Sequence, residues 1–220
     1  MTTIFRLDSS IRSEGSVTRA IADVLEKEIS AHIPELDVIR REIGLTPLPS
    51  TIWSDSVVGG MMPTEVRSPE QSKALALATR LADELAQADA YIFAIPLYNF
   101  GVSQHAKAWV DVVLTEPRFN PQASQFMAGR PAFLVTARGG AYGPSTPRAG
   151  WDHSTAWLLR ILVDVWGLDV RSIETELTLA DVNSAMEALR PMATQMRQAA
   201  HEAALTYGSG LANALRAKAN

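Results

Sequence analysis

Cysteine is absent from the 220 residues of the chain. Its absence excludes disulfides, thiolate zinc sites, iron–sulfur clusters and cysteine nucleophiles. Nor does the first segment, Met1–Asp8, carry a basic leader followed by a long apolar run. We therefore expect a cytoplasmic protein whose first residues form a strand.

Other absences narrow the set of partners. No apolar run is long enough to span a membrane, and the formal net charge of -4 comes without a long run of one sign, so neither a membrane nor a nucleic acid is expected. The histidines lack metal-ligand spacing, which argues against a metal site; they are His32, His105, His153 and His201. Because a Walker-A sequence and a G-x-G-x-x-G fingerprint are also missing, nucleotide triphosphatases and standard dinucleotide-binding enzymes are disfavoured.

The composition is that of an ordinary globular protein, with 47% hydrophobic and 20% charged residues. No repeat or low-complexity linker divides the chain. We predict a single domain over residues 1–207, followed by a tail at residues 208–220 to which the sequence assigns no role.

Five short apolar segments alternate with helical patterns. The segments are Ile4–Leu7, Leu36–Ile39, Tyr91–Ile95, Ala132–Thr136 and Val170–Thr175. Such alternation predicts βαβ units, and hence an α/β fold with a doubly wound, five-stranded parallel sheet, strand order 2-1-3-4-5, and helices on both faces.

Some helix boundaries are marked by capping residues. A helix is expected to begin near Ser16, and Ser68-Pro69-Glu70-Gln71 has the residues of a capping box. The last helix is predicted to run from an N-cap at Asp181 to a stop at Gly208 and Gly210. The segment Trp53–Arg67 is interpreted as a loop over the ligand.

In a doubly wound sheet, ligands bind beyond the carboxyl ends of the strands where the strand order reverses. The loop after the first strand, Ser9–Thr18, places hydroxyl side chains directly before a helix, where Ser10, Ser16 and Thr18 could bind a phosphate monoester. The alternative is that these hydroxyls only cap the helix.

Two further loops follow the third and fourth strands. The turn Pro96–Ser103 offers Tyr98, Asn99 and Phe100, which together supply a flat apolar surface and polar groups for an isoalloxazine ring, although a proline turn with core aromatics remains the alternative. The loop Thr136–Gly143 joins an arginine to two glycines, so its backbone can approach a ligand closely.

Three motifs in order resemble those of the FMN-dependent NADH azoreductases and quinone reductases, which have a flavodoxin-like fold. The motifs are Ser9-Ser10-Ile11 with Ser16-Val17-Thr18, the P-L-Y-N-F-G turn before Lys107-Ala108-Trp109-Val110-Asp111, and A-R-G-G at residues 137–140. The resemblance extends to about residue 200. Leu97 stands where many members have methionine and Ala137 where serine is usual, which leaves substrate choice open.

The resemblance implies bound FMN, with NADH as electron donor. The phosphate end would be held by Ser10, Ser16, Val17 and Thr18, the ring would meet Leu97, Tyr98, Asn99 and Phe100, and the site would be completed by Ala137, Arg138, Gly139 and Gly140. It also implies a ping-pong reaction in which NADH leaves before a small flat aromatic substrate, a quinone or azo compound, is reduced. Members of the family are homodimers with sites at the subunit interface, so Trp151, Trp157 and Trp166 would lie at that interface, in the pocket or in the core.

Two side chains could assist the reaction itself. His153 is a hypothetical proton donor to the reduced substrate, and Arg138 could stabilise the reduced ring electrostatically. No other catalytic side chain is expected, because the cofactor performs the redox step.

Three alternatives remain beside this interpretation. A flavodoxin-type electron-transfer protein would bind FMN, but such carriers are usually shorter and strongly acidic. A flavin reductase acting on a specialised metabolite would use the same site. A serine hydrolase is disfavoured because the chain has no G-x-S-x-G elbow.

Overall fold

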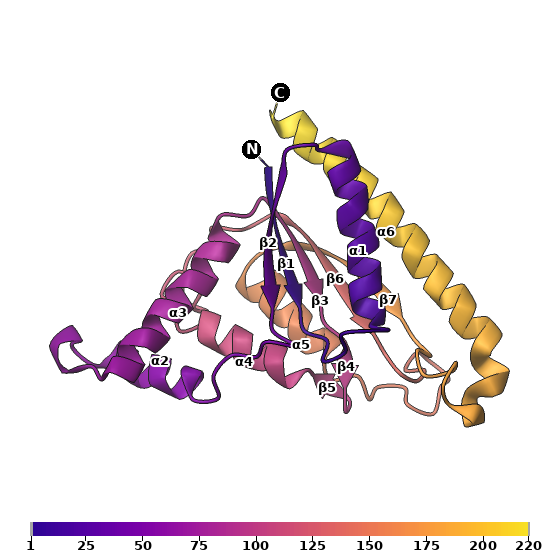
Figure 1. Cartoon of the computed structure of the whole chain (residues 1–220), viewed down its shortest axis with the longest axis horizontal. Coiled ribbons are helices and arrows are strands. Elements are labelled where there is room, and N and C mark those ends of the chain that lie inside the picture. The colour runs from indigo at the N-terminus through magenta and orange to yellow at the C-terminus, as the bar shows by residue number, and fades with distance from the viewer. Residues whose placement is uncertain (1, 220) are drawn as a thin grey trace.

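A computed structural model of the chain describes residues 2–219 (Figure 1). Its main sheet is parallel, with strand order β2-β1-β3-β6-β7. The strands are β1 (Thr2–Asp8), β2 (Leu36–Glu42), β3 (Ala90–Ala94), β6 (Pro131–Ala137) and β7 (Asp169–Thr175). A small antiparallel hairpin, β4 (Leu97–Tyr98) with β5 (Gly101–Val102), interrupts the chain order after β3. Counting only the main strands, the predicted order 2-1-3-4-5 is confirmed.

Helices cover both faces of the sheet, as predicted (Figure 1). One face is covered by α1 (Val17–His32) and α6 (Arg190–Ala219). The other is covered by α3 (Pro69–Ala86), α4 (Gln104–Val113), α5 (Thr155–Leu159) and the π-helical segment Arg160–Val165, while α2 (Ile52–Met61) packs on α3. No helix within residues 2–219 is long and apolar enough to cross a membrane.

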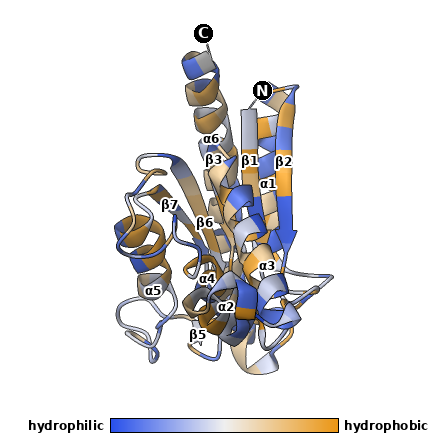
Figure 2. Cartoon of the chain, turned by 90° about the vertical axis from the view of Figure 1, so that its left-hand side faces the viewer, coloured by the Kyte–Doolittle hydropathy of each residue, from blue (hydrophilic) through white to orange (hydrophobic). Residues whose placement is uncertain are grey.

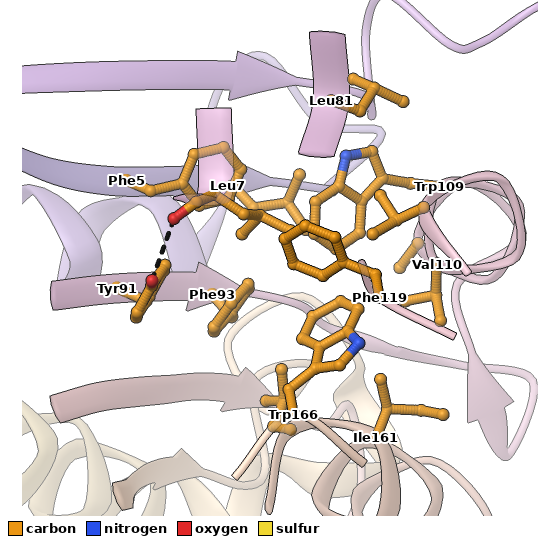
Figure 3. Packing of buried hydrophobic residues seen from close by; sticks show 14 of the residues in the cluster. Phe5, Leu7, Leu81, Tyr91, Phe93, Trp109, Val110, Phe119, Ile161 and Trp166 are labelled. Atoms are coloured by element: carbon orange, nitrogen blue, oxygen red, sulfur yellow. Dashed lines mark hydrogen bonds between the residues drawn. The ribbon is translucent and has the colours of Figure 1, made fainter. Parts of the chain in front are cut away.

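The alternation of side chains along β3 explains why there are two cores. Tyr91 and Phe93 point to the α3 and α4 side, whereas Ile92 points to the α1 and α6 side. Figure 3 shows the first of these cores, in which Phe5 stacks on Trp109 at a centroid distance of 5.9 Å. Trp166 meets Trp109 edge-on at 5.9 Å and is buried, so it is a core residue.

The predicted helix starts at Ser16 and Ser68 are confirmed. The Ser16 side chain accepts a hydrogen bond from the backbone N–H of Arg19 at the start of α1. At the start of α3, Ser68 and Gln71 form both hydrogen bonds of a capping box.

The predicted boundaries of the last helix are wrong. Residues Ser184–Leu189 form a 3₁₀ segment whose N-cap is Asn183 rather than Asp181, because the Asn183 side chain accepts the backbone N–H of Ala185. The α-helix begins only at Arg190 and continues through Gly208 and Gly210 to Ala219, rising beyond the sheet (Figure 2). Gly208 does not stop the helix: it lies where α6 crosses α1, and a Cβ there would be 2.8 Å from the Cβ of Glu28. The division into a domain at residues 1–207 and a tail stays a prediction.

The segment Trp53–Arg67 is not the predicted loop. It forms most of α2 and the 3₁₀ turn Thr64–Val66. Two β-branched residues followed by two glycines are weak helix formers, so helix propensity did not predict this helix. Packing against α3 stabilises it, because Ile52, Ser56 and Gly59 form a buried face.

Candidate functional site

The loop after β1 ends at the N-terminus of α1 with its hydroxyl side chains buried. Ser10, Ser16 and Thr18 are all buried, and the hydroxyl oxygens of Ser16 and Thr18 lie 3.3 Å apart. Gly15 has a φ of +64°, a backbone conformation that suits glycine, and turns the chain into the helix. The first backbone N–H groups of a helix carry partial positive charge, so this end of the loop favours an anion.

Contacts with the end of β2 hold this loop in place. Arg19 donates to the carbonyl of Ser10 at 2.7 Å and also pairs with Glu42. Burial alone would raise the pKa of Glu42, but hydrogen bonds from Arg19 and from the backbone N–H groups of Leu45 and Gly44 hold that pKa below its ordinary value. A Cβ on Gly44 would lie 2.0 Å from the carbonyl oxygen of Ser10, so only glycine fits there.

The loop after β3 is a two-residue hairpin between β4 and β5. Its central residues, Asn99 and Phe100, have φ values of 48° and 67°. Positive φ at both central positions is the mark of a type I′ turn, and it is uncommon for a bulky residue such as phenylalanine. The strained turn presents Asn99 and Phe100 as exposed side chains at the carboxyl edge of the sheet.

The loop after β6 is joined to the segment that follows β7. The backbone N–H of Leu177 donates to the carbonyl of Gly140 at 3.1 Å, and that of Thr178 donates to the carbonyl of Arg138 at 3.1 Å. Residues 177–179 therefore run beside the loop, and Thr178 and Leu179 line the same hollow as the loop.

The side chain of Arg138 is held by acidic residues and does not line the hollow. Its guanidinium donates to Asp152 at 2.7 Å, to Glu174 at 2.6 Å and to the hydroxyl of Thr155 at 2.9 Å. Burial would raise the pKa of Asp152, but the N–H groups of Thr155 and Ser154 and the Arg138 charge keep it below its ordinary value. The Arg138 side chain therefore ties the third loop to Asp152 and Glu174, and its contact with a ligand stays a prediction.

The three loops enclose a hollow of about 360 Å³ at the carboxyl edge of the sheet. Every cofactor-binding residue predicted from the sequence lines it, except Arg138. Those residues are Ser10, Ser16, Val17, Thr18, Leu97, Tyr98, Asn99, Phe100, Ala137, Gly139 and Gly140.

The hollow also has walls that were not predicted. The additional lining residues are Arg12, Gly15, Pro96, Tyr142, Arg148, Thr178 and Leu179. The first three and Tyr142 lie inside loops whose sequence already indicated a ligand, so proximity to the motifs could have found them. Thr178 and Leu179 follow the fifth main strand, and only the adjacency of β6 and β7 brings them in.

Aromatic side chains gather at one end of the hollow. The ring of Phe100 meets Trp151 edge-on at 5.4 Å and Tyr142 at 6.4 Å between centroids. Trp151 is 50% exposed, whereas Trp157 is half-buried beneath the ammonium of Lys107. The His153 side chain is exposed and does not line the hollow, although its backbone N–H donates to the carbonyl of Phe100 at 2.9 Å. Its role as a proton donor stays a hypothesis.

The parallel sheet and its loop-lined hollow define a doubly wound α/β protein, and the hollow lies at the carboxyl edge of the sheet, where such proteins bind their ligands. The chain belongs to the flavodoxin-like fold family, whose model matches residues 2–200. The resemblance drawn from the sequence motifs is thereby confirmed.

Similar proteins agree with this assignment. The chain is 34% identical over 218 residues to the FMN-dependent NADH:quinone oxidoreductase of Streptomyces coelicolor, with 99% of this chain and 98% of that protein covered. A protein of the same name from Streptomyces avermitilis is 34% identical over 214 residues, covering 97% and 98%. A solved azoreductase structure from Bacillus anthracis has the same fold, with a TM-score of 0.74 at 17% identity over 96% of this chain and 100% of that one.

Proposed function

We propose that this chain is an FMN-dependent NADH:quinone oxidoreductase that also reduces azo compounds. The observation that carries the proposal is the hollow between the loops after β1, β3 and β6, with buried hydroxyls at a helix N-terminus and exposed aromatic rings. A phosphorylated flavin has those two kinds of chemistry at its two ends. The names of the Streptomyces relatives support the same activity.

The hydroxyl end fits a phosphate monoester. Ser10, Ser16 and Thr18 offer hydroxyl donors, and the backbone N–H of Val17 and its neighbours lie at the start of α1. Arg12 adds a positive charge to the wall. These residues would hold the phosphate of FMN without a metal ion.

The other end fits a flat heterocycle. Leu97, Tyr98, Asn99 and Phe100 would meet one part of the flavin ring, and Ala137, Gly139 and Gly140 would approach it from the third loop. When bound, FMN accepts a hydride from NADH and passes it to a quinone or azo acceptor. The protein contributes the flat walls of Phe100 and Tyr142, which suit an aromatic acceptor and displace water from it.

Spectroscopy of the purified protein tests the proposal. We expect a yellow protein with flavin absorbance that NADH bleaches in the absence of oxygen and of any partner reductase, and that a quinone or azo dye recolours. A protein that holds FMN but is not bleached by NADH would be an electron carrier instead. A protein that does not bind added FMN would contradict both.

We further propose a homodimer, because α2 and the turn after it expose apolar side chains. Met61 is 79% exposed, and Trp53, Val58, Met62 and Val66 are also exposed. Single exposed apolar side chains are common on protein surfaces, but five on one short segment favour a surface that contacts a partner. Light scattering after gel filtration should give twice the chain mass, and a monomer that is fully active would contradict a site shared between subunits.

The proposal also includes NADH as the electron donor and a cytoplasmic location. Arg67, the one arginine of the segment Trp53–Arg67, donates to the carbonyls of Gly59 and Met62 and so is engaged within its own segment. We propose NADH rather than NADPH because the Streptomyces relatives are named as NADH enzymes, and steady-state rates with both donors test it. A cytoplasmic location, expected from the sequence, is checked by cell fractionation.

A further inference from the structure

Arg148 lies at the aromatic end of the hollow. Its guanidinium carbon is 5.8 Å from the ring centroid of Phe100 and 5.9 Å from that of Tyr142. A Cβ on Gly140 would lie 2.8 Å from its Nη1 atom, so the guanidinium rests against the third loop. Arg148 is thus placed where a flat ligand would meet the rings.

Within residues 2–219, no carboxylate lies within salt-bridge distance of Arg148. A nearby carboxylate, that of Glu176, accepts the backbone N–H of Tyr142 at 3.1 Å and lies 3.6 Å from the guanidinium of Arg138. Arg138, by contrast, is surrounded by acids. The charge of Arg148 is therefore available to a ligand.

The chemistry of a guanidinium over aromatic rings indicates which ligand fits. A planar guanidinium can lie over a ring face while its N–H groups stay free, and those groups match the two oxygens of a carboxylate or sulfonate. An aromatic ligand that packs on Phe100 could therefore place an anionic substituent on Arg148.

The two ends of the hollow carry separate cations. Arg12 belongs to the hydroxyl loop, where its Nη2 atom lies 3.2 Å from the position of a Cβ on Gly15. Arg148 belongs to the aromatic end. The phosphate of a flavin is therefore accounted for without Arg148.

We propose that Arg148 is a specificity residue that selects flat aromatic acceptors carrying an anionic group. This inference rests on the proposed oxidoreductase function, whose acceptor class it narrows. The same N–H groups could instead bind the pyrophosphate of NADH, so the experiment distinguishes an anionic acceptor from NADH as the ligand of Arg148.

The test compares binding of naphthalene-2-carboxylate and naphthalene-2-carboxamide, which share shape but differ in charge, by calorimetry with and without bound FMN. The native chain should favour the carboxylate about tenfold, as one exposed charge-assisted contact allows, and added salt should reduce that ratio. Arg148→Gln should bring the ratio close to one. Arg148→Lys should retain part of it, because the charge stays but the fork geometry is lost.

The matched control is Arg171→Gln, because Arg171 also lies over an aromatic ring, that of Tyr207, but lines no part of the hollow. This variant should keep the tenfold ratio. Equal binding of both ligands by the native chain, or an unchanged ratio in Arg148→Gln, would overturn the proposal.

A second measurement decides whether Arg148 binds the electron acceptor or the electron donor, NADH. The NADH concentration that half-saturates the rate of flavin reduction should be the same in the native chain and in Arg148→Gln. If that concentration rises while the naphthalene ratio is unchanged, Arg148 serves the dinucleotide and the proposal is wrong. Failure to bind FMN would instead reject the proposed function, and the difference between the ratios of the native chain and Arg148→Gln, measured without FMN, would still decide the role of Arg148.

Discussion

The hydroxyl oxygens of Tyr98 and Ser10 lie 3.3 Å apart, and the Tyr98 oxygen also accepts the backbone N–H of Ile11 at 3.2 Å. One side chain of the hairpin thus fastens the loop that would bind phosphate. The two motifs are far apart in the sequence, so this contact couples the ring end of the hollow to its phosphate end.

Tyr98→Phe should therefore weaken FMN binding while leaving the fold intact. A hydrogen bond of this kind is worth about 1 kcal/mol, which corresponds to a loss of about fivefold in affinity. Titration of the apoprotein with FMN, followed by quenching of flavin fluorescence, measures it. Tyr207→Phe is the control, because Tyr207 stacks on Phe133 outside the hollow. Equal affinities in the two variants would show that the Tyr98 contact does not order the loop.

Gly44→Ala tests the close approach beneath the same loop. The added Cβ would lie 2.0 Å from the backbone oxygen of Ser10, which cannot move aside as a flexible side chain can. We expect a loss of about 3 kcal/mol or more in the free energy of unfolding, together with loss of FMN binding. Urea unfolding and FMN titration measure the two effects.

The control for that substitution is Gly60→Ala in α2, where a Cβ would meet no atom within 4 Å. Alanine is the better helix former, so this variant should be as stable as the native chain or more stable by up to about 1 kcal/mol. If Gly44→Ala behaved like Gly60→Ala, the packing of Gly44 on Ser10 would not constrain the loop.

The fold and most of the residues that line the hollow could be predicted because their signals are local. Buried strands such as β3 are short apolar runs, and the start of α3 is marked by the capping residues Ser68 and Gln71. The order of the strands then placed the predicted loops at one edge of the sheet, where the hollow lies.

The features that the sequence missed depend on tertiary contacts. α2 contains weak helix formers and is stabilised by packing on α3. Leu179 reaches the hollow only because β7 lies beside β6. The family resemblance implied ligand contact for Arg138, which stays a prediction, but the sequence did not show that its side chain pairs with Asp152 and Glu174, which lie 14 and 36 residues further along the chain.

Asp152→Asn should destabilise the protein in a pH-dependent way. The folded pKa of Asp152 lies below its ordinary value, so its stabilising effect is present above the unfolded pKa and is lost as the pH falls through the folded pKa. We expect a cost of about 1 to 2 kcal/mol at pH 7, because Glu174 still partners Arg138, and a smaller difference from native below about pH 4.

Urea unfolding of native and variant protein from pH 3 to pH 7 measures this difference. Asp164→Asn is the control, since Asp164 pairs with Arg160 on the surface and its loss should cost less than about 0.5 kcal/mol. A difference between native and Asp152→Asn that stays constant over the whole pH range would show that the Asp152 charge does not stabilise the fold.

The C-terminal turns of α6 contribute to the second core, although the sequence indicated only a tail. Leu211 is 5% exposed and packs in the cluster that includes Leu25 and Ile29 of α1, whereas Leu205 of the same helix is 38% exposed. Leu211→Ala should cost about 2 to 3 kcal/mol of unfolding free energy, and Leu205→Ala less than about 1 kcal/mol, because only the first leaves a cavity. Urea unfolding of the two variants gives the comparison. Since both substitutions remove the same atoms from the same helix, equal costs would mean that residues beyond Gly208 do not pack on α1 in solution, and the tail predicted from the sequence would then be the better description.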